Sequence, residues 1–392
     1  DIINNKIKEN RMTTKILKGN NFDTLKTLDD QSINTVVTSP PYWGLRDYGT
    51  GTWEGGDPDC PHMRTTKISV NTATGHKGMA DKGHAVGDAI YKDICPKCNA
   101  VRKDSQLGLE DTPEQFAHNL VMLFREIRRV LRDDGTVWLN LGDTYSSHKD
   151  CKSTSQTLAK GTQSEKAHVI DKGKSVSRDT KKLKSAGLKN KDLIGIPWRV
   201  AFALQQDGWY LRQDIIWHKP NPMPESVKDR CTKAHEYIFL FSKNKKYYYD
   251  NEAIKEDCIT VNSKGEKGKP NSVKSIGKSV KGLNGFEIRD GFKNMKAQPK
   301  KNKRSVWTVA TKPYKEAHFA TYPPELIEPC IRAGCPKGGT VLDPFGGSGT
   351  TAEVAVNNNC NAVLLELNKD YIDLAKNRIN KNITAEYKLN VY

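Results

Sequence analysis

The sequence predicts an α/β fold, with a sheet covered by helices on both faces. Short apolar, β-branched runs alternate with stretches whose apolar residues recur at helical spacing. One such run leads into an acid, a glycine turn and the start of a helix, which is typical of α/β units. The chain has 392 residues, of which 36% are hydrophobic, so it can form a sizeable core without a disulfide scaffold.

The expected elements are justified in chain order by periodicity and by turn residues. Residues 33–38 (INTVVT) form an apolar, β-branched run that ends in Ser-Pro-Pro, which indicates a strand. Residues 113–131 carry apolar side chains at helical spacing, and Asp134-Gly135 then turns the chain into a strand over 136–141. The later expected elements are a helix over 193–204, strands over 210–217, 237–241, 340–343 and 362–366, and helices from 348 and over 371–379.

The net charge of +17 is concentrated in two segments. Residues 149–191 hold 12 Lys and Arg against 4 Asp and Glu, and residues 258–304 hold 13 against 3. This excess favours a polyanionic partner. The composition of the first segment is equally consistent with a solvated loop and with a segment that contacts a DNA backbone and becomes ordered on binding. For the second, which also carries Phe286, Phe292 and Arg289, DNA contact is the favoured interpretation.

The sequence shows no sign of export or membrane insertion. No apolar run approaches the roughly 20 residues of a transmembrane helix, and the first residues lack the apolar core of a signal peptide. The nine cysteines are unevenly spaced, as in cytosolic thiols or metal ligands. We therefore expect a cytoplasmic protein with no membrane partner.

A glycine turn follows the expected strand over 340–343, in the sequence DPFGGSGTT (343–351). Glycines let a ligand lie close to the backbone, and the start of the next helix offers free N–H groups. No Lys follows the glycines, so this is not a Walker phosphate loop. The next strand ends at Glu366, where an acid commonly binds ribose hydroxyls. The alternative is a plain tight turn with a surface acid.

A second motif, TSPPYW (38–43), lies just past the strand over 33–38. Its two prolines fix a stiff turn. The turn presents the Ser39 hydroxyl, the Pro40 carbonyl and the Tyr42 ring at the carboxyl edge of the sheet, where open α/β sheets bind ligands. Acceptors for an exocyclic amine beside a stacking ring suit a nucleotide flipped out of a duplex. A structural proline turn is the alternative.

The two motifs together resemble those of the DNA amino-methyltransferases that use S-adenosylmethionine. TSPPYW precedes DPFGGSGTT by about 300 residues, an order that resembles the circularly permuted β group of that family. The resemblance covers most of the chain outside the basic segments, including 108–147, 195–226 and 317–331. It implies a Rossmann-like methyltransferase fold, in which a mostly parallel sheet has an antiparallel edge strand.

The resemblance also implies residue roles. Ser39, Pro40, Pro41 and Tyr42 would hold the target base, and Glu366 would bind the cofactor ribose. The other residues expected to line the cofactor pocket are Asp343, Phe345, Gly346, Gly347, Gly349, Thr350 and Phe319. In this family SPPY more often accompanies methylation of cytosine N4 than of adenine N6, so we expect cytosine, with adenine as the alternative. Asn20 departs from the family, where an acid usually follows the glycine.

The implied reaction needs no protein nucleophile. The amino nitrogen of the flipped base attacks the sulfonium methyl group in line, and acceptors at Ser39 and Pro40 orient that nitrogen. A cysteine-dependent route to C5 of the base is disfavoured. Pro329-Cys330 lies in the apolar helix pattern ELIEPCIRAG, so we assign this cysteine to the core.

Three cysteines and one histidine lie in two close pairs that match a tetrahedral structural zinc site. The pairs are Cys60-Pro61-His62 and Cys95-Pro96-Lys97-Cys98. Zinc would staple the insertion 44–105, which is rich in glycine and lacks a core of its own. Free thiols in a loop are the alternative, and His76 and His84 are reserve ligands.

Several residues are candidates for DNA contact. His218 follows a strand near the expected base pocket, although a hydrogen-bonded structural histidine is equally consistent. Trp307 is either core or DNA-facing, and His235-Glu236 opens an apolar strand and is interpreted as structural. The expected DNA contacts are Trp43, His218, Lys219, Arg289, Lys300, Lys301, Lys303 and Arg304.

The domain organisation follows from these assignments. We predict a catalytic domain over 13–43, 106–257 and 305–385, a zinc-binding insertion over 44–105, a basic mobile loop over 149–191 and a target-recognition region over 258–304. The expected partners are double-stranded DNA and a cognate restriction endonuclease, in a bacterial or phage setting, with the chain as a monomer or homodimer. One alternative is methylation of RNA or of protein glutamine, which the motif order disfavours. Another is a DNA-binding protein without activity, which the intact motifs disfavour.

Overall fold

The computed structural model describes residues 12–44, 48, 50–64, 89–91, 94–146, 187–257, 300–312, 321–383 and 387–392. Most of the first basic segment and residues 258–299 of the second lie outside the described residues, as do Arg289, Phe319, His76 and His84. Among the described helices, not one combines the length and apolarity that a membrane span requires.

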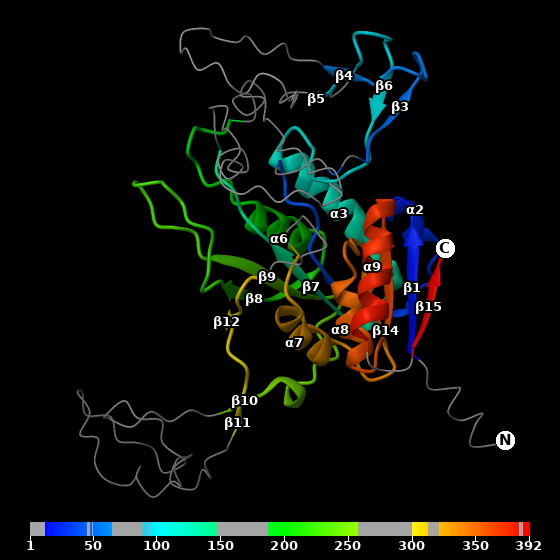
Figure 1. The fold of residues 1–392 in the computed structure, drawn as a ribbon. Helices are drawn as coiled ribbons and strands as arrows, with labels where there is room; N and C mark the ends of the chain where they lie inside the picture. Colours follow the sequence, from blue (N-terminus) through cyan, green and yellow to red (C-terminus); the bar gives the residue numbers. More distant parts are fainter. Residues whose placement is uncertain are drawn as a thin grey trace, which may run out of the picture.

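A nine-stranded sheet runs through the molecule in the order β12-β8-β9-β7-β2-β13-β14-β1-β15 (Figure 1). Neighbouring strands are parallel except where β9 is involved, which confirms the mostly parallel α/β sheet. The strands are β1 (Met12–Lys18), β2 (Ile33–Thr38), β7 (Leu131–Leu141), β8 (Tyr210–His218), β9 (His235–Ser242), β12 (Val306–Thr308), β13 (Thr340–Asp343), β14 (Asn361–Glu366) and β15 (Tyr387–Val391).

The antiparallel strand does not lie at the edge of the sheet, and that expectation was wrong. β9 is the third strand from the edge, between β8 and β7, and it is antiparallel to both. β8 returns beside it, and β12 then pairs with β8 in parallel and forms the edge. Because β9 is reversed, its first residues lie at the edge where the parallel strands end. That places His235 and Glu236 at the carboxyl edge of the sheet.

Helices cover both faces of the sheet and enclose two separate cores. Apolar residues of α2 (Asn21–Lys26), α3 (Pro113–Val130) and α6 (Ile196–Gln206) pack on one face. Those of α7 (Pro324–Gly334), α8 (Thr350–Asn357) and α9 (Lys369–Asn382) pack on the other. Cys330 on α7 is fully buried in the second core, as expected.

The two ends of the chain complete the sheet together. β1 lies between β14 and β15 and is parallel to both. The Thr13 amide donates to Asn361 Oδ1 at 2.8 Å across 348 residues of sequence. A strand from the start of the chain therefore forms part of a sheet whose neighbouring strands come from its end, as a permuted order requires.

The insertion between β2 and α3 stands away from the sheet (Figure 1). Its described strands form two small antiparallel pairs, β3 (Thr52–Glu54) with β6 (Val101–Lys103) and β4 (Met63–Arg64) with β5 (Ala89–Ile90). None of its described residues between 44 and 105 belongs to either core cluster. A further short pair, β10 (Glu256–Asp257) with β11 (Lys300–Lys301), joins the two ends of the second basic segment, next to the 3₁₀ helix η1 (Glu252–Ile254).

Candidate active site

The carboxyl ends of the parallel strands open into a cavity of about 930 Å³. The chain leaves β2 toward α3 on one face and leaves β13 toward α8 on the other. Such divergence opens a crevice between adjacent strands, which is where open α/β sheets bind ligands. The two motifs predicted from the sequence, SPPY after β2 and the glycine turn after β13, both line this cavity.

Asp343 anchors the glycine turn at the end of β13. Its buried carboxylate accepts hydrogen bonds from Thr38 Oγ1 and Thr351 Oγ1, both at 2.6 Å, from Tyr322 OH at 2.9 Å and from the Phe345 amide at 3.0 Å. Burial raises the pKa of Asp343 to about 6. This one side chain therefore ties β2, β13 and the start of α8 together beneath the cavity.

The glycines of the turn are required by close packing. A Cβ on Gly346 would lie 2.8 Å from Leu364 Cβ, and a Cβ on Gly349 would lie 2.9 Å from Ala375 Cβ. Gly349 also has a φ of +80°, a conformation that favours glycine. The turn thus lies flat against β14 and α9 and leaves the cavity above it open.

Glu366 closes this end of the cavity at the end of β14. Its carboxylate accepts hydrogen bonds from the Gly347 amide at 2.7 Å and the Asn368 amide at 2.8 Å. Burial raises the pKa of Glu366 to about 7. A fixed carboxylate beside the backbone of Gly347 at the cavity wall suits the hydroxyls of a ribose. The end of the cavity lined by Phe345, Gly347 and Glu366 is called the cofactor end below.

A strip from the margin of the insertion covers the cofactor end, and the sequence did not indicate it. The Tyr48 amide donates to Gln106 Oε1 at 2.7 Å, and the Tyr48 carbonyl accepts from Asn368 Nδ2 at 3.3 Å. The Tyr48 and Tyr371 rings meet edge to face, with centroids 6.2 Å apart. All four residues line the cavity, but none lies in a motif that marks it in the sequence.

Ser39, Pro40, Pro41 and Tyr42 line the other end of the cavity, called the base end below. The Tyr42 hydroxyl donates to Glu236 Oε2 at 2.7 Å. Burial, and then the charge of Glu236, raise the pKa of Tyr42 well above its usual value, so the phenol stays protonated. The interpretation of Glu236 as merely structural missed this contact, because β9 is reversed.

The loop that carries SPPY is fastened to the chain just before α3. Trp43 is only 2% exposed, and its Nε1 donates to the Glu110 carbonyl at 2.8 Å. The Gly44 amide donates to the Gly108 carbonyl at 2.7 Å. The prediction that Trp43 contacts DNA was wrong, because the ring is packed into the core beneath the loop.

Two basic side chains at the base end, Lys233 and His235, were not assigned to the site from the sequence. Lys233 Nζ donates to the Asp143 carbonyl at 2.8 Å, and the Asp143 carboxylate accepts from the Gly195 and Ile196 amides at the start of α6. Burial lowers the pKa of Lys233 and of His235. Both side chains line the cavity, so its base end carries donors as well as acceptors.

The residues expected to contact DNA have varied surroundings. His218 Nδ1 lies 3.1 Å from Thr308 Oγ1, and Lys219 forms an ion pair with Glu236 inside the cavity. Arg304 pairs with Glu256 at 2.6 Å, and Lys303 lies over the Trp307 ring, 5.0 Å from its centroid. Trp307 itself is core, at 6% exposure. Lys300 and Lys301 form β11.

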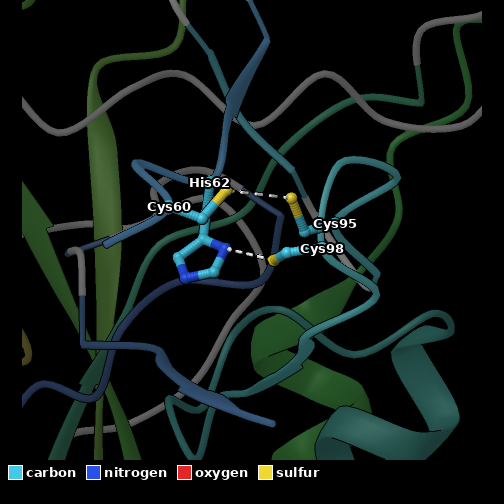
Figure 2. Close-up of side chains that lie close together, drawn as sticks. All are labelled: Cys60, His62, Cys95 and Cys98. Carbon is cyan, nitrogen blue, oxygen red and sulfur yellow. Dashed lines mark hydrogen bonds between the residues drawn. The ribbon is translucent and has the colours of Figure 1, made fainter. Parts of the chain in front are cut away.

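The four predicted metal ligands come together in the insertion (Figure 2). Their ligand atoms all lie within 4.8 Å of one another, with Cys60 Sγ 3.7 Å from Cys95 Sγ and Cys98 Sγ 3.4 Å from His62 Nδ1. Sulfurs around a tetrahedral zinc are separated by about 3.8 Å, given a Zn–S bond of about 2.3 Å. The spacing and the donor chemistry therefore fit zinc.

The cluster is connected to the rest of the insertion by packing. Trp53 on β3 stacks on the His62 ring with centroids 4.3 Å apart. A Cβ on Gly56 would lie 2.8 Å from Cys98 Sγ, so the chain passes close beside the ligands. On β6, Arg102 pairs with Asp104 at 2.7 Å, and Asp104 accepts from Thr50 Oγ1 at the cavity wall.

The fold and the cavity define an α/β protein with a ligand pocket at the carboxyl edge of its sheet, lined by SPPY and by the glycine turn. The sequence profile of the N6/N4 DNA methylases, described as DNA methylase, matches residues 33–377. The chain belongs to this family and is an S-adenosylmethionine-dependent DNA amino-methyltransferase.

Individual relatives agree with this assignment. Type II methyltransferase M.SmaI of Serratia marcescens is 39% identical over 373 residues, which cover 95% of this chain and 93% of that protein. Type II methyltransferase M.Cfr9I of Citrobacter freundii is 38% identical over 364 residues, which cover 93% and 87%. The structure of PvuII DNA methyltransferase (cytosine-N4-specific) has a TM-score of 0.51 at 14% identity and covers 97% of this chain and 96% of its own, which shows a common fold.

Proposed function

We propose that this enzyme methylates N4 of cytosine in double-stranded DNA. The SPPY sequence at the base end of the cavity carries the proposal, because its serine matches the motif that more often accompanies N4-cytosine methylation in this family. Ser39, Pro40 and Pro41 form the rigid turn, and Tyr42 supplies the ring on which a flipped base stacks. Methylation of adenine N6 is the alternative that the experiment below tests.

The catalytic contribution of the protein is positioning. The Ser39 hydroxyl and the Pro40 carbonyl accept hydrogen bonds from the exocyclic amine and orient its nitrogen toward the cofactor end. Bound S-adenosylmethionine supplies an electrophilic methyl group. The nitrogen loses one proton as it gains the methyl group, and that proton passes to solvent water, while the two acceptors keep the nitrogen oriented toward the cofactor end. No cysteine is needed, which agrees with the burial of Cys330.

The cofactor end is proposed to hold S-adenosylmethionine. Glu366 receives the ribose hydroxyls, the backbone of the glycine turn approaches the rest of the molecule, and Asp343 holds the turn in place. The remaining residues proposed for this pocket are Phe345, Gly346, Gly347, Gly349 and Thr350 in the described chain, with Phe319 outside it.

The Cys60, His62, Cys95 and Cys98 cluster is proposed to bind a structural zinc ion. All four tetrahedral positions would be filled by protein, so no position remains for a substrate. The ion would replace the core that the described part of the insertion lacks. Zinc would thereby hold the strip containing Tyr48 in place over the cofactor end.

The proposed setting is a restriction–modification system, with a cognate endonuclease as functional partner, in the cytoplasm of a bacterium or a phage-infected cell. The relatives named type II methyltransferases support this setting. The second basic segment, 258–304, is proposed as the target-recognition region and 149–191 as a further DNA contact, because together they carry the positive charge of the chain. The proposed target-recognition region contains the expected DNA contacts Arg289, Lys300, Lys301, Lys303 and Arg304. The expected contact His218 lies outside it, near the base end of the cavity.

The deciding experiment is methylation of plasmid DNA with labelled cofactor, followed by mass spectrometry of the nucleosides. We expect N4-methylcytosine, with Ser39→Ala lowering the rate ~100-fold through loss of one positioned acceptor. Asp373→Ala, at an exposed ion pair on α9, is the matched control and keeps the wild-type rate. N6-methyladenine would overturn the choice of base, and product only on RNA or protein would overturn DNA as the substrate.

A further inference from the structure

A cluster of polar side chains surrounds the Tyr42 hydroxyl, and the mechanism above does not use it. Tyr42 OH lies 2.7 Å from Glu236 Oε2 and 3.2 Å from Asn140 Oδ1. A phenol has one proton, so the shorter contact, to the carboxylate, is the hydrogen bond that it donates. Asn140 Nδ2 donates to the Tyr237 carbonyl at 3.0 Å and lies 3.3 Å from Glu236 Oε2. Glu236 is therefore the centre of the cluster.

The charge of Glu236 is balanced by Lys219. The ammonium group pairs with Glu236 Oε1, and the two side chains are only 18% and 15% exposed. Lys219 Nζ also lies 4.3 Å from the centroid of the Trp217 ring. An unpaired carboxylate with so little exposure would carry a large desolvation cost. The ion pair therefore places a cation against this carboxylate, which accepts the hydrogen bond of Tyr42 beside the pocket for the base.

The ring of Tyr42 is also fixed along its edge. A Cβ on Gly142 would lie 2.4 Å from Tyr42 Cε2 and 3.0 Å from Cδ2, so the ring packs directly on the Gly142 backbone. Tyr42 follows β2, Gly142 follows β7, and Glu236 lies on β9. Three strands thus hold the ring at its hydroxyl end and at its edge, and all of these residues line the cavity.

We propose that Glu236, supported by Lys219 and Asn140, is a positioning residue that fixes the Tyr42 ring as the stacking surface for the target base. The inference rests on the role of Tyr42 in the proposed function. A ring that is already ordered loses no further freedom when the base arrives, so the methyl-accepting nitrogen reaches its geometry more often. Glu236 acts through Tyr42 and does not touch the base.

Kinetics of four single variants on plasmid DNA test this inference. Tyr42→Phe keeps the ring but removes the hydroxyl, and Glu236→Ala removes the acceptor. Each is expected to lower kcat by ~10- to 100-fold, with the Kd for S-adenosylmethionine within about twofold of wild type, because the cofactor end is untouched. Tyr42→Ala tests the ring itself, and Asp373→Ala is the surface control.

Combined variants separate positioning from mere structural support. The double variant Tyr42→Phe/Glu236→Ala is expected to be no slower than either single variant, because both remove the same contact. Glu236→Gln/Lys219→Met keeps an acceptor oxygen without the charges and is expected to recover at least tenfold in kcat over Glu236→Ala. This neutral pair also serves where Glu236→Ala fails to fold.

Each outcome bears on one of the two proposals. Additive losses in the double variant, or a slow Glu236→Ala beside a wild-type Tyr42→Phe, would show that Glu236 does not act through the hydroxyl and would overturn the inference. An inactive Tyr42→Ala beside wild-type rates for both Tyr42→Phe and Glu236→Ala would overturn it as well, while leaving the stacking role intact. A fully active Tyr42→Ala would instead overturn the proposed role of Tyr42.

Discussion

The carboxyl edge of the sheet and the insertion 44–105 hold their functional side chains in place by different means. At the edge, Asp343, Glu366 and Glu236 stand on strands that are buried on both faces by two apolar cores. In the insertion, the four candidate ligand side chains lie in the segments between the strands of two short pairs, and these strands share no residue with those cores. Order at the edge comes from apolar burial, whereas order in the insertion would depend on the proposed zinc ion.

The two regions therefore differ in what stabilises them. A two-stranded pair is marginally stable by itself in water, so the insertion needs an additional constraint. The edge needs none, and it uses its burial to shift the pKa values of Asp343 and Glu366 upward. The two regions meet at Tyr48, whose backbone joins Gln106 on one side and Asn368 on the other. The predictions below test whether they are separate in stability yet coupled at that contact.

The largest effect is expected on removing the proposed metal ligand Cys98 by Cys98→Ser. Binding of a structural zinc contributes ~10–16 kcal/mol to ordering its site, so the insertion should lose its structure. We expect one zinc per wild-type chain and none in the variant by elemental analysis, rapid proteolysis within 44–105, and weaker cofactor binding through loss of the Tyr48 contact. Cys231→Ser, at an exposed thiol, is the control. Zinc-free wild-type protein, or cooperative unfolding of the whole chain, would contradict the comparison.

The next effect is expected at the edge, from Asp343→Ala. The change leaves two buried donors, on Thr38 and Thr351, and two part-buried donors without this acceptor, which should lower the free energy of unfolding by ~3–5 kcal/mol. Urea unfolding measures this loss, and zinc content should stay at the wild-type level because the insertion is unaffected. A loss below about 1 kcal/mol, similar to that of a surface change, would show that the edge is less dependent on this carboxylate than its four contacts indicate.

A pH effect of intermediate size is expected from Glu366. Its pKa of about 7 means that it ionises between pH 6 and pH 8, and its proposed role requires the ionised form to accept hydrogen bonds from ribose hydroxyls. The affinity for S-adenosylmethionine should therefore be about tenfold weaker at pH 6 than at pH 8. The free energy of unfolding depends on pH in the opposite direction from cofactor affinity. The folded chain keeps a proton on Glu366 that the unfolded chain releases, so the contribution of Glu366 to stability falls as pH rises toward 7.

Titration calorimetry at the two pH values tests this dependence. Glu366→Gln should bind the cofactor equally at both, because the amide does not titrate. A wild-type affinity that does not change with pH would contradict the role assigned to the carboxylate at the cofactor end.

The smallest effect is expected where the insertion joins the catalytic domain. Thr112 caps α3, its side chain accepting from the Gln115 amide at 3.1 Å. Thr112→Ala should lower stability by about 1 kcal/mol. If the two regions are separate in stability, thermal melting of the core shifts while zinc content and the proteolysis of 44–105 do not. Parallel changes in both would show that they unfold as one unit.

Much of the fold was predictable because its signals are local. The strand 33–38 and the strand 340–343 match β2 and β13, and the helix 113–131 differs from α3 by one residue. The helix expected over 193–204 begins later, at Ile196, because Asp143 from the end of β7 caps it there. β7 begins five residues before the expected strand 136–141, at Leu131, directly after α3. Such boundaries depend on partners distant in sequence.

The candidate site was predictable only where a motif marks it. Ser39, Tyr42, Asp343 and Glu366 lie in or next to short motifs, and the structure brings them to one cavity. Glu236, Tyr48, Asn140 and Lys233 carry no such mark. Their positions in the cavity depend on the strand order, on the reversal of β9 and on the contact of Tyr48 with the cofactor end. The periodicity of the sequence does not predict any of these. Charge patterning likewise gave no means of separating the buried Trp43 from a surface ring.

The position of β1 has a consequence for the time course of folding during synthesis. The Thr13 amide bonds to Asn361, 348 residues further along the chain, so β1 is synthesised well before the strand β14 with which it pairs. At ~5–20 residues per second, this interval is about 20–70 s. For most of that interval the glycine turn has not been made, and Glu366 follows only after Asn361, so the nascent chain cannot modify DNA. In the proposed restriction–modification setting, synthesis of the methyltransferase would therefore have to be complete before the cognate endonuclease accumulates in the host.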